Sequence, residues 1–419
     1  MSKVTVLGGG GWAIALAKVL NENGHNVTLW SALEREVEAL TKERENKVGL
    51  PGVKIPEEIK ITNDIKEAVK DSKMIVMAVA SSFVRSTSEL LKDIVPDGQI
   101  IVDVAKGIED GTFYTMTEVI EDVIPTVNAV VLSGPSHAEE VGLQVPTAVV
   151  VGAKTFETAS FVQRLFSNDY FRAYTSPDRK SIELGGSLKN VIALAAGIAD
   201  GLGYGDNTEA ALMTRGIKEI TQLGVAMGGH SRTFHGLSGI GDLIVTCGSK
   251  HSRNRRAGIL IGKGYTLDEA VKEVNMVVEG AVSAKAALEL AHKYNVDMPL
   301  VESVNQVLFE NKPAKEAMRD IMKRDLTHEF PDLVWEQDMN DLNAKKEELV
   351  KQFEGLDSTF SEIKMLMTYY ECAILEVKTK LDVLNKEFQA NELRNPIETI
   401  KTRIKSPASI MEKLERKGF

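Results

Sequence analysis

The sequence of 419 residues contains only two cysteines, Cys247 and Cys372. Two thiols cannot build a disulfide framework, so small stapled secreted domains are excluded and a reducing compartment is expected. No basic and then apolar leader precedes the first apolar segment, which gives no indication of secretion. The longest apolar run, residues 191–199, is shorter than the roughly 20 residues that a membrane-spanning helix needs. These absences predict a cytoplasmic protein with no integral membrane association.

The chain also has fewer basic than acidic residues: 50 Lys and Arg and 60 Asp and Glu, which give a net charge of -10. Nucleic acids and anionic membranes repel a chain of this charge, so neither is an expected partner. Any site for an anion must therefore be local. The hydrophobic content of 43% and the charged content of 26% are those of a globular protein, and the length predicts two or more domains.

The first segment of the chain has the order strand, glycine turn, helix. Val4, Val6 and Leu7 indicate a short buried strand, and four glycines follow it. Residues 12–20 then repeat apolar side chains at helical spacing. Gly8 allows a tight turn, and Gly10 lets backbone amides approach a pyrophosphate at the start of the helix. With Ala13 at the third position, this pattern is typical of a dinucleotide-binding turn. The alternative is a plain tight turn in another α/β protein.

Short apolar strands then alternate with helices up to about residue 179. This alternation predicts a dinucleotide-binding domain over residues 1–179, with an α/β Rossmann fold and a doubly wound, mostly parallel sheet. Lys106 and the loop 133–136 follow two of the strands, so both are expected at the carboxyl edge of the sheet, where ligands bind. The expected strands are residues 4–7, 25–30, 73–80, 98–105, 127–132 and 147–152.

The second expected strand ends at Trp30, where such sheets often carry an acid for ribose hydroxyls or an arginine for a 2′-phosphate. Here Ser31, Ala32 and Leu33 follow, and a helix over residues 34–43 comes next. The sequence therefore leaves the choice between NAD and NADP open. It predicts use of NADH and NADPH within roughly tenfold of each other, about 1.4 kcal/mol.

After residue 179 the strand signals stop, and residues 180–325 predict an all-α substrate and catalytic domain. Small residues, among them Gly185 and Gly197, crowd its first helix, which indicates a close approach either of neighbouring helices or of a ligand. The expected helices are residues 181–198, 207–227, 267–274, 282–294 and 300–311.

Three polar clusters carry the candidate chemistry of this helical part. Lys189 lies in an otherwise apolar helix and is either a lysine at the helix edge with a solvated ammonium or a lysine held in a site. Asp242 follows a glycine run and is either a helix cap or an orienting carboxylate. Ser252, Arg253 and Asn254 precede an expected helix and form either a solvated basic face or a clamp for one phosphate. Together the three clusters would supply a general base, a carboxylate and an anion site.

Several longer motifs occur in one order along residues 1 to about 325. They are GGGGWAIALA near the start, AKGIE at 105–109, LSGPSHAEEV at 132–141, LGGSLKNVIALAAGIADGLGYGDNTEAALMTRG at 184–216, GLSGIGDLIVTC at 236–247, SRN at 252–254 and VVEG at 277–280. With these motifs the chain resembles the NAD(P)-dependent glycerol-3-phosphate dehydrogenases of the bacterial type. The resemblance implies reversible reduction of dihydroxyacetone phosphate to sn-glycerol 3-phosphate with NADH or NADPH, which supplies phospholipid synthesis.

The resemblance also implies the site residues. Lys189 is the implied proton donor and acceptor, and no metal is implied. The implied substrate-binding residues are Lys106, Gly134, Ser136, Lys189, Asp242, Ser252, Arg253 and Asn254. The dinucleotide-binding residues, from the glycine turn and the resemblance together, are Gly8, Gly10, Gly11, Trp12, Lys106, Ala138, Arg253, Val277 and Glu279.

The chain departs from this family at a few positions. Gly11, Ala13, Ala80 and His137 stand where the family usually has Ser, Gly, Pro and Phe. These changes affect the stiffness of loops more than the chemistry. The family's frequent arginine beyond the second strand is also missing, which argues against a strong preference for NADP.

For Lys189 we expect a pKa below the ordinary value of about 10.4. Partial burial and the like charges of Lys106 and Arg253 would lower this pKa, and the carboxylate of Asp242 would partly oppose them. A lowered pKa would suit a lysine that exchanges a proton with substrate near neutral pH.

The last part of the chain, residues 326–419, is rich in Lys and Glu and predicts a helical extension over residues 334–353 and 361–389. Apolar residues recur along the second helix at the spacing of a core-facing or coiled-coil stripe, so a homodimer is one expected outcome. The motif NPIETIKTRIKSPASIMEKLERKG at 395–418 resembles the leader segment of the small alarmone synthetases of the GTP pyrophosphokinase family. The catalytic core that follows this leader in that family has no counterpart here.

Two other functions stay open: a related dehydrogenase of a hydroxy acid, and a nucleotide-sensing regulatory protein whose tail is an interaction helix pair. Lys189 favours an enzyme, because a sensor needs no base. The clamp at residues 252–254 favours a phosphate over a carboxylate. The expected partner is therefore a small-molecule phosphate substrate, and the expected cofactor is NAD or NADP.

Overall fold

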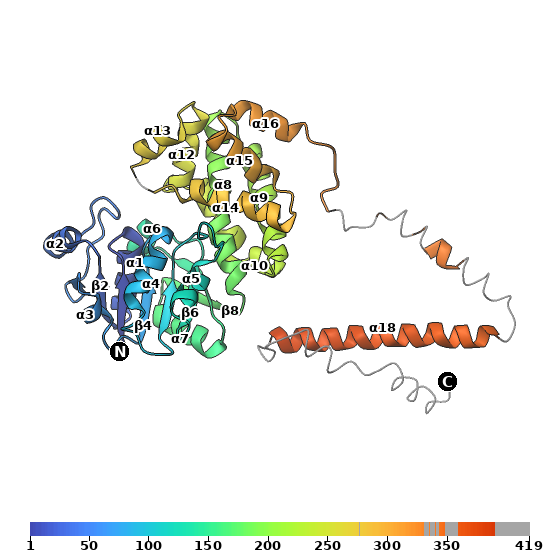
Figure 1. Ribbon diagram of the computed structural model, residues 1–419, viewed down its shortest axis with the longest axis horizontal. Coiled ribbons are helices and arrows are strands. Elements are labelled where there is room, and N and C mark those ends of the chain that lie inside the picture. Colours follow the sequence, from blue (N-terminus) through green and yellow to red (C-terminus); the bar gives the residue numbers. More distant parts are fainter. Residues whose placement is uncertain (276, 331–334, 336–339, 341–342, 348–358, 390–419) are drawn as a thin grey trace. The chain divides into compact units, whose positions relative to one another are not determined.

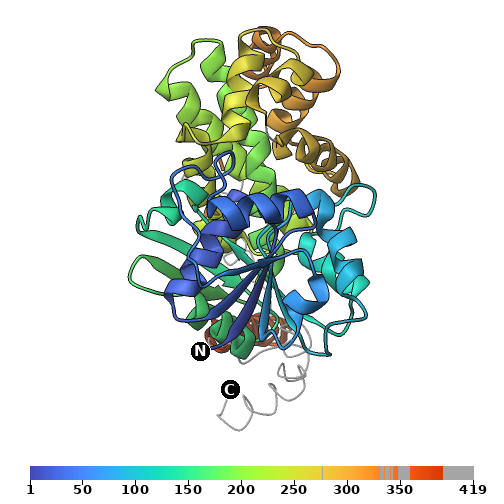
Figure 2. The same ribbon diagram turned by 90° about the vertical axis from the view of Figure 1, so that its left-hand side faces the viewer.

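The computed structural model describes residues 1–275, 277–330, 335, 340, 343–347 and 359–389 (Figure 1). The chain divides into two compact units, Met1–Arg324 and Asp325–Phe419. All the residues expected at a site lie in the first unit, which combines a sheet and a bundle of helices (Figure 2).

A single eight-stranded sheet forms the first half of this unit. Its strands are β1 (Lys3–Leu7), β2 (Asn26–Trp30), β3 (Lys60–Thr62), β4 (Met74–Met77), β5 (Ile100–Asp103), β6 (Asn128–Ser133), β7 (Thr147–Gly152) and β8 (Phe171–Ser176). Their order is β3-β2-β1-β4-β5-β6-β7-β8, and every neighbouring pair is parallel except β6 and β7. The predicted doubly wound, mostly parallel sheet is confirmed.

Two edge strands of the sheet escaped prediction. β3 has only three residues, which is too short for a hydrophobic pattern. β8 carries polar and charged side chains on its outward face, because Arg172 is exposed while Phe171 and Ala173 are buried. Both strands gain their place from pairing with a neighbour rather than from their own composition.

Helices cover both faces of the sheet. One face packs its apolar side chains against α1, α6 and α7, and the other packs against α3, α4 and α5, so the sheet is buried from both sides. The helices of this half are α1 (Gly11–Glu22), α2 (Glu34–Glu43), α3 (Ile65–Val69), α4 (Val84–Leu91), α5 (Met116–Val123), α6 (Ala138–Gly142) and α7 (Phe156–Phe166).

The second half of the unit is helical and surrounds one long helix, α8 (Arg179–Gly201). Among the described residues, only α8 is long and apolar enough to cross a membrane, and its apolar window is entirely buried inside the protein. The other elements are α9 (Asp206–Ala226), α10 (Ser231–Phe234), the π-helical turn η2 (Leu237–Gly241), α11 (Asp242–Gly248), α12 (Arg253–Gly262), α13 (Leu267–Val274), α14 (Glu279–Tyr294), α15 (Pro299–Phe309) and α16 (Ala314–Met322).

Neighbouring helices explain the small residues of α8. A Cβ at Gly197 would lie 2.2 Å from the carbonyl oxygen of Arg255, and one at Gly201 would lie 2.3 Å from that of Ile259. Both carbonyls belong to α12, so glycine lets the two backbones touch at these positions. Of the two alternatives left by the sequence, close helix packing is the one that the structure shows here.

The second unit contains α18 (Thr359–Gln389), which includes the helix expected over residues 361–389. Side chains of its apolar stripe are exposed, among them Tyr370, Ile374 and Leu381. Most of the other expected helix, residues 334–353, and the whole alarmone-synthetase-like motif at 395–418 lie outside the described residues. That resemblance therefore stays a prediction.

Candidate active site

The glycine turn after β1 leaves the start of α1 open. Gly8 has a φ of 129°, and a Cβ there would lie 2.6 Å from the carbonyl oxygen of Ala78, so only glycine fits. Gly10 is the N-cap of α1 without a side-chain cap, and no protein atom lies within 4 Å of the position of its missing Cβ. The first amides of α1 therefore face open space and can bind a pyrophosphate, so the turn fits a dinucleotide.

The next two residues bring α1 against a loop and the core. A Cβ at Gly11 would lie 2.3 Å from the carbonyl oxygen of Gly49, so the loop after α2 passes directly over the start of α1. Asn46 fixes this loop, because its Nδ2 donates to the carbonyl oxygen of Gly9 at 2.9 Å. Trp12 is half-buried and packs on the core. The family's serine at position 11 would not fit this loop arrangement.

Two loops at the carboxyl edge of the sheet present polar groups to the helical part. Lys106 follows β5, and its Nζ donates to the carbonyl oxygen of Gly134 at 3.4 Å. Gly134 follows β6 with a φ of 149°, and the Oγ of Ser136 donates to the same carbonyl oxygen at 3.0 Å. The strand ends thus gather all three residues, as their positions after the strands predict.

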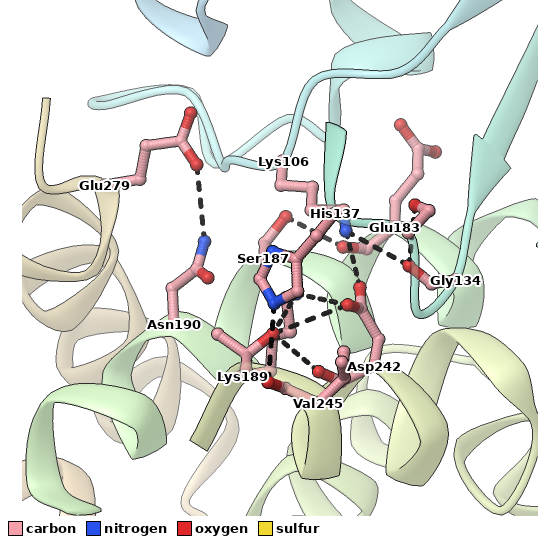
Figure 3. A network of polar contacts seen from close by, with 12 residues as sticks. Lys106, Gly134, His137, Glu183, Ser187, Lys189, Asn190, Asp242, Val245 and Glu279 are labelled. Atoms are coloured by element: carbon pink, nitrogen blue, oxygen red, sulfur yellow. Dashed lines mark hydrogen bonds and ion pairs between the residues drawn. The ribbon is translucent and has the colours of Figure 1, made fainter. Parts of the chain in front are cut away.

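Asp242 joins this edge to the long helix of the bundle. The ammonium of Lys189, on α8, donates to Oδ1 of Asp242, and Nζ of Lys106 lies 2.7 Å from Oδ2 (Figure 3). Asp242 is 1% exposed and Lys189 is 5% exposed, so their contact is shielded from water, whereas the side chain of Lys106 is 20% exposed. Asp242 begins α11, but its carboxylate pairs with the lysines instead of serving as a plain helix cap.

Burial lowers the pKa of Lys189 to about 7, because an ammonium without water around it is costly. The carboxylate of Asp242 raises this pKa, and the ammonium of Lys106 lowers it. The expected direction is confirmed, but burial is complete rather than partial and is the largest cause. A lysine tuned in this way can give or take a proton near neutral pH.

Thr246 completes the surroundings of Lys189 and was missed by the sequence analysis. Its Oγ1 accepts from Nζ of Lys189 at 2.5 Å and donates to the carbonyl oxygen of Asp242 at 2.6 Å. Thr246 stands four residues after Asp242, and residues at this spacing share one face of a helix. That spacing is the signal in the sequence that could have found it.

The start of α12 holds the three residues of the expected phosphate clamp. Ser252 is the N-cap, and its Oγ accepts from the backbone amide of Arg255 at 3.2 Å. Oδ1 of the buried Asn254 accepts from the backbone amide of Gly280 at 2.9 Å. Arg253 is the first residue of the helix and is half-buried. The helix start and the guanidinium together offer positive potential to an anion.

The start of α14 faces α8 from the other side. The Nδ2 of Asn190 donates to Oε2 of Glu279 at 3.4 Å (Figure 3). Burial raises the pKa of Glu279, and the positive charges of Arg253, Lys106 and Lys189 oppose that rise. Arg253 therefore acts electrostatically on Glu279, which lies in the same charged region as the two lysines.

Not all expected residues are joined by contacts. Side-chain hydrogen bonds connect Lys106, Lys189 and Asp242 with the loop at Gly134, whereas Ala138 begins α6 and packs on the core. Val277 is 54% exposed on the way into α14. The glycine turn contributes backbone and space rather than side chains.

His137 lies at the edge of the cluster, although the sequence analysis assigned it no role. Its Nε2 is 3.5 Å from the carbonyl oxygen of Val245 (Figure 3). The centroid of its ring is 6.1 Å from that of His251. Burial lowers the pKa of His137, and the charge of Lys189 lowers it further. The imidazole therefore favours its neutral form beside the lysines.

The whole first unit is similar to known proteins. The family profiles described as NAD-dependent glycerol-3-phosphate dehydrogenase N-terminus and C-terminus match residues 3–159 and 178–319. A protein of Fusobacterium nucleatum called glycerol-3-phosphate dehydrogenase (NAD(P)+) is 60% identical over 327 residues, which are 78% of this chain and 98% of that protein. A protein of the same name from Agathobacter rectalis is 58% identical over 335 residues, 80% of this chain and 100% of that protein.

Solved structures agree with the sequence relatives. The crystal structure of a glycerol-3-phosphate dehydrogenase from Coxiella burnetii matches with a TM-score of 0.75 and 33% identity, and the match covers 77% of this chain and 99% of that chain. Both family profiles, close relatives matched over almost their full length and this structure point the same way. The chain belongs to the NAD-dependent glycerol-3-phosphate dehydrogenase family.

Proposed function

We propose that the chain catalyses the reversible reduction of dihydroxyacetone phosphate to sn-glycerol 3-phosphate, with NADH or NADPH as the second substrate. The observation that carries this proposal is the hydrogen bonding of the buried carboxylate of Asp242, which accepts from the buried Lys189 and from the partly exposed Lys106 at the carboxyl edge of the sheet. The open glycine turn lies at the same edge, where ligands of such sheets bind.

Lys189 exchanges the proton of the reaction. In reduction its Nζ–H donates a proton to the oxygen on C2 as the carbonyl becomes an alcohol, and in oxidation the neutral amine takes that proton back. Asp242 and Thr246 hold the ammonium in place through direct hydrogen bonds. Lys106 supplies a second positive charge that stabilises the negative charge developing on the oxygen.

The substrate phosphate binds at the start of α12. Arg253, with its planar guanidinium, forms the charged part of the clamp, and the amides that begin the helix add to it. Ser252 and Asn254 contribute mainly by fixing the helix start and its contact with Gly280. Holding the phosphate away from the reacting carbon orients C2 for the reaction.

The glycine turn and the start of α1 hold the pyrophosphate of the dinucleotide, with Gly8, Gly10, Gly11 and Trp12 as its residues. Lys106, Ala138, Arg253, Val277 and Glu279 belong to the remainder of the same binding region. When bound, the nicotinamide supplies the hydride that C2 receives.

Domain boundaries and the tail are part of the same proposal. Residues 1–179 form the dinucleotide-binding domain and residues 180–325 the substrate domain, in agreement with the last strand ending at Ser176 and α8 beginning at Arg179.

Residues 326–419 take no part in the reaction. Truncation after Arg324 should leave kcat and KM unchanged, and loss of activity would show that the tail completes the enzyme. We further expect a cytoplasmic enzyme and, through the stripe of α18, a homodimer.

Steady-state kinetics of the purified full chain tests the proposed function. NADH oxidation is followed with dihydroxyacetone phosphate, with dihydroxyacetone and with a short 2-oxo acid. A rate that requires the phosphate supports the proposal, and equal rates with and without phosphate contradict it. Activity with the 2-oxo acid alone would favour the hydroxy-acid dehydrogenase, and nucleotide binding without any turnover would favour the sensor.

A further inference from the structure

A carboxylate, that of Glu36, lies at the end of β2, although Glu36 does not directly follow this strand in the sequence. Ser31 follows Trp30, the last residue of β2, and its Oγ donates a hydrogen bond to Oε2 of Glu36 in the first turn of α2. The backbone amide of Leu33 also donates to Oγ of Ser31, at 3.3 Å. Although Glu36 stands six residues after the strand, this turn folds its carboxylate back to the strand end.

The same carboxylate lies over the glycine turn. A Cβ at Gly9 would lie 2.5 Å from Cδ, 2.5 Å from Oε2 and 2.9 Å from Oε1 of Glu36. Gly9 has no side chain, so the carboxylate can rest against the backbone of the turn. Glu36 therefore lies between the end of β2 and the turn expected to hold the pyrophosphate.

We propose that Glu36, held by Ser31, makes this enzyme prefer NADH to NADPH. In dinucleotide-binding sheets the groups at the end of the second strand face the adenosine ribose. A carboxylate there accepts hydrogen bonds from the two hydroxyls of that ribose and repels a 2′-phosphate. No acid directly follows Trp30 in the sequence, which predicted use of NADH and NADPH within roughly tenfold of each other. The position of Glu36 leads us to expect a larger preference instead.

Neither of the arginines near Glu36 along the chain, Arg35 and Arg44, forms an ion pair with it among the described residues. Arg35 is exposed on the same helix, beside the exposed Glu34. Arg44, at the end of α2, donates to the carbonyl oxygen of Ile59 at 2.8 Å and pairs with Glu57 at 3.3 Å. A 2′-phosphate at the carboxylate would therefore meet a negative group without an arginine committed to it.

The test is equilibrium binding of NADH and NADPH to the full chain, measured by calorimetry, with kcat/KM for both nucleotides as a second readout. We expect the wild type to bind NADH about 100-fold more tightly than NADPH. Glu36→Gln should reduce that ratio to about tenfold or less, chiefly by improving NADPH binding, since the charge is removed and the shape is kept. Ser31→Ala should reduce it less, because the carboxylate loses only its anchor.

Glu38→Gln is the matched control, because Glu38 is exposed on the same helix and two residues away. It should leave the ratio at its wild-type value. A wild-type ratio within about threefold, or a ratio that Glu36→Gln leaves unchanged, would overturn the proposal. Glu36→Arg serves if Glu36→Gln fails to fold, and it should favour NADPH. The inference rests on the proposed function only where kcat/KM is the readout. A preference for NADH in binding without any turnover would support the role of Glu36 and contradict the dehydrogenase activity.

Discussion

The two ends of the proposed site are built from different materials. At the dinucleotide end the glycine turn offers backbone amides and empty space beside Gly10. At the substrate end Lys106, Lys189 and Asp242 form a cluster of charged side chains from three distant segments, and Lys189 and Asp242 are buried. The dinucleotide end can bind its ligand because side chains are absent there. The substrate end depends on the charge and burial of its side chains.

This difference decides how each end should respond to mutation. Adding a methyl group at the glycine turn blocks space without changing any charge. Removing a charge from the cluster leaves a partner buried without its counter-charge, which costs more than a lost surface contact. We therefore expect larger effects at the substrate end, on catalysis, and smaller ones at the dinucleotide end, on binding.

The largest effect is expected for Lys189→Ala. If Lys189 transfers the proton, kcat should fall by about two to four orders of magnitude while NADH binding stays nearly unchanged. Steady-state kinetics and a binding titration measure the two quantities separately. Turnover close to wild type would remove Lys189 from the mechanism.

Arg253→Ala should have the next largest effect. Loss of a charged hydrogen-bonding group should raise KM for dihydroxyacetone phosphate by roughly 10- to 100-fold, and Arg253→Lys should restore binding only in part because the planar fork is lost. Arg256→Ala is the control, since Arg256 is exposed on the same helix. An equal loss with dihydroxyacetone would show that Arg253 does not bind the phosphate.

Gly10→Ala tests the dinucleotide end. The φ of Gly10 is -72°, and no protein atom lies near its Cβ position, so the variant should fold with an unchanged Tm. Its methyl group should nevertheless enter the space for the dinucleotide and raise Kd for NADH by about tenfold. Gly205→Ala is a matched control, because Gly205 is also an open N-cap, on α9. Unchanged NADH binding in both variants would move the dinucleotide away from this turn.

A smaller effect concerns stability, where Glu183 of α8 is hydrogen-bonded to Thr117 of α5, a helix that packs on the sheet. Oε1 accepts from the amide of Thr117 at 2.7 Å and Oε2 from its Oγ1 at 2.5 Å. Burial raises the pKa of Glu183 from 4.5 to about 7, and the hydrogen bonds from Thr117 partly oppose this rise. Between these values the folded state keeps a proton that the unfolded chain has lost, so stability falls as pH rises.

Denaturant unfolding as a function of pH measures this contribution. Glu183→Gln should remove a slope of up to about 1.4 kcal/mol per pH unit from the window between the two pKa values. Glu157→Gln, an exposed glutamate on α7, should leave the slope as it is. A wild-type profile identical to that of Glu183→Gln would show that Glu183 does not titrate in this range.

The difference between the glycine turn and the charged cluster also explains which parts of the site could be predicted from the sequence. The glycine turn is local, so Gly8 and Gly10 were recognisable from a few consecutive residues, and alternating strands and helices gave the sheet. Lys189, Asp242 and Arg253 were recognisable as candidates, but single residues of this kind have ordinary structural explanations. The long motifs that the chain shares with glycerol-3-phosphate dehydrogenases identified these residues as parts of one site. The fold shows which of them are in contact.

What escaped prediction depends on backbone paths. Thr246 contacts Lys189 from its place one turn after Asp242. Glu36 reaches the end of β2 because only residues 31–33 separate that strand from α2. The short strand β3 and the mixed strand β8 are set by their neighbours in the sheet. The helical spacing of Asp242 and Thr246 could have indicated their contact, whereas the position of Glu36 and the pairing of β3 and β8 follow only from the folded chain.

The central claim is that burial lowers the pKa of Lys189 so that it exchanges a proton near neutral pH. The pH dependence of kcat/KM, measured for reduction and for oxidation, tests this claim most directly. Burial lowers the pKa of Lys189 to about 7, so the protonated form needed for reduction is lost above that pH. Reduction of dihydroxyacetone phosphate should then fall about tenfold per pH unit above pH 7, while oxidation of sn-glycerol 3-phosphate should rise toward pH 7 and level off. Flat profiles in both directions across this range would contradict the account.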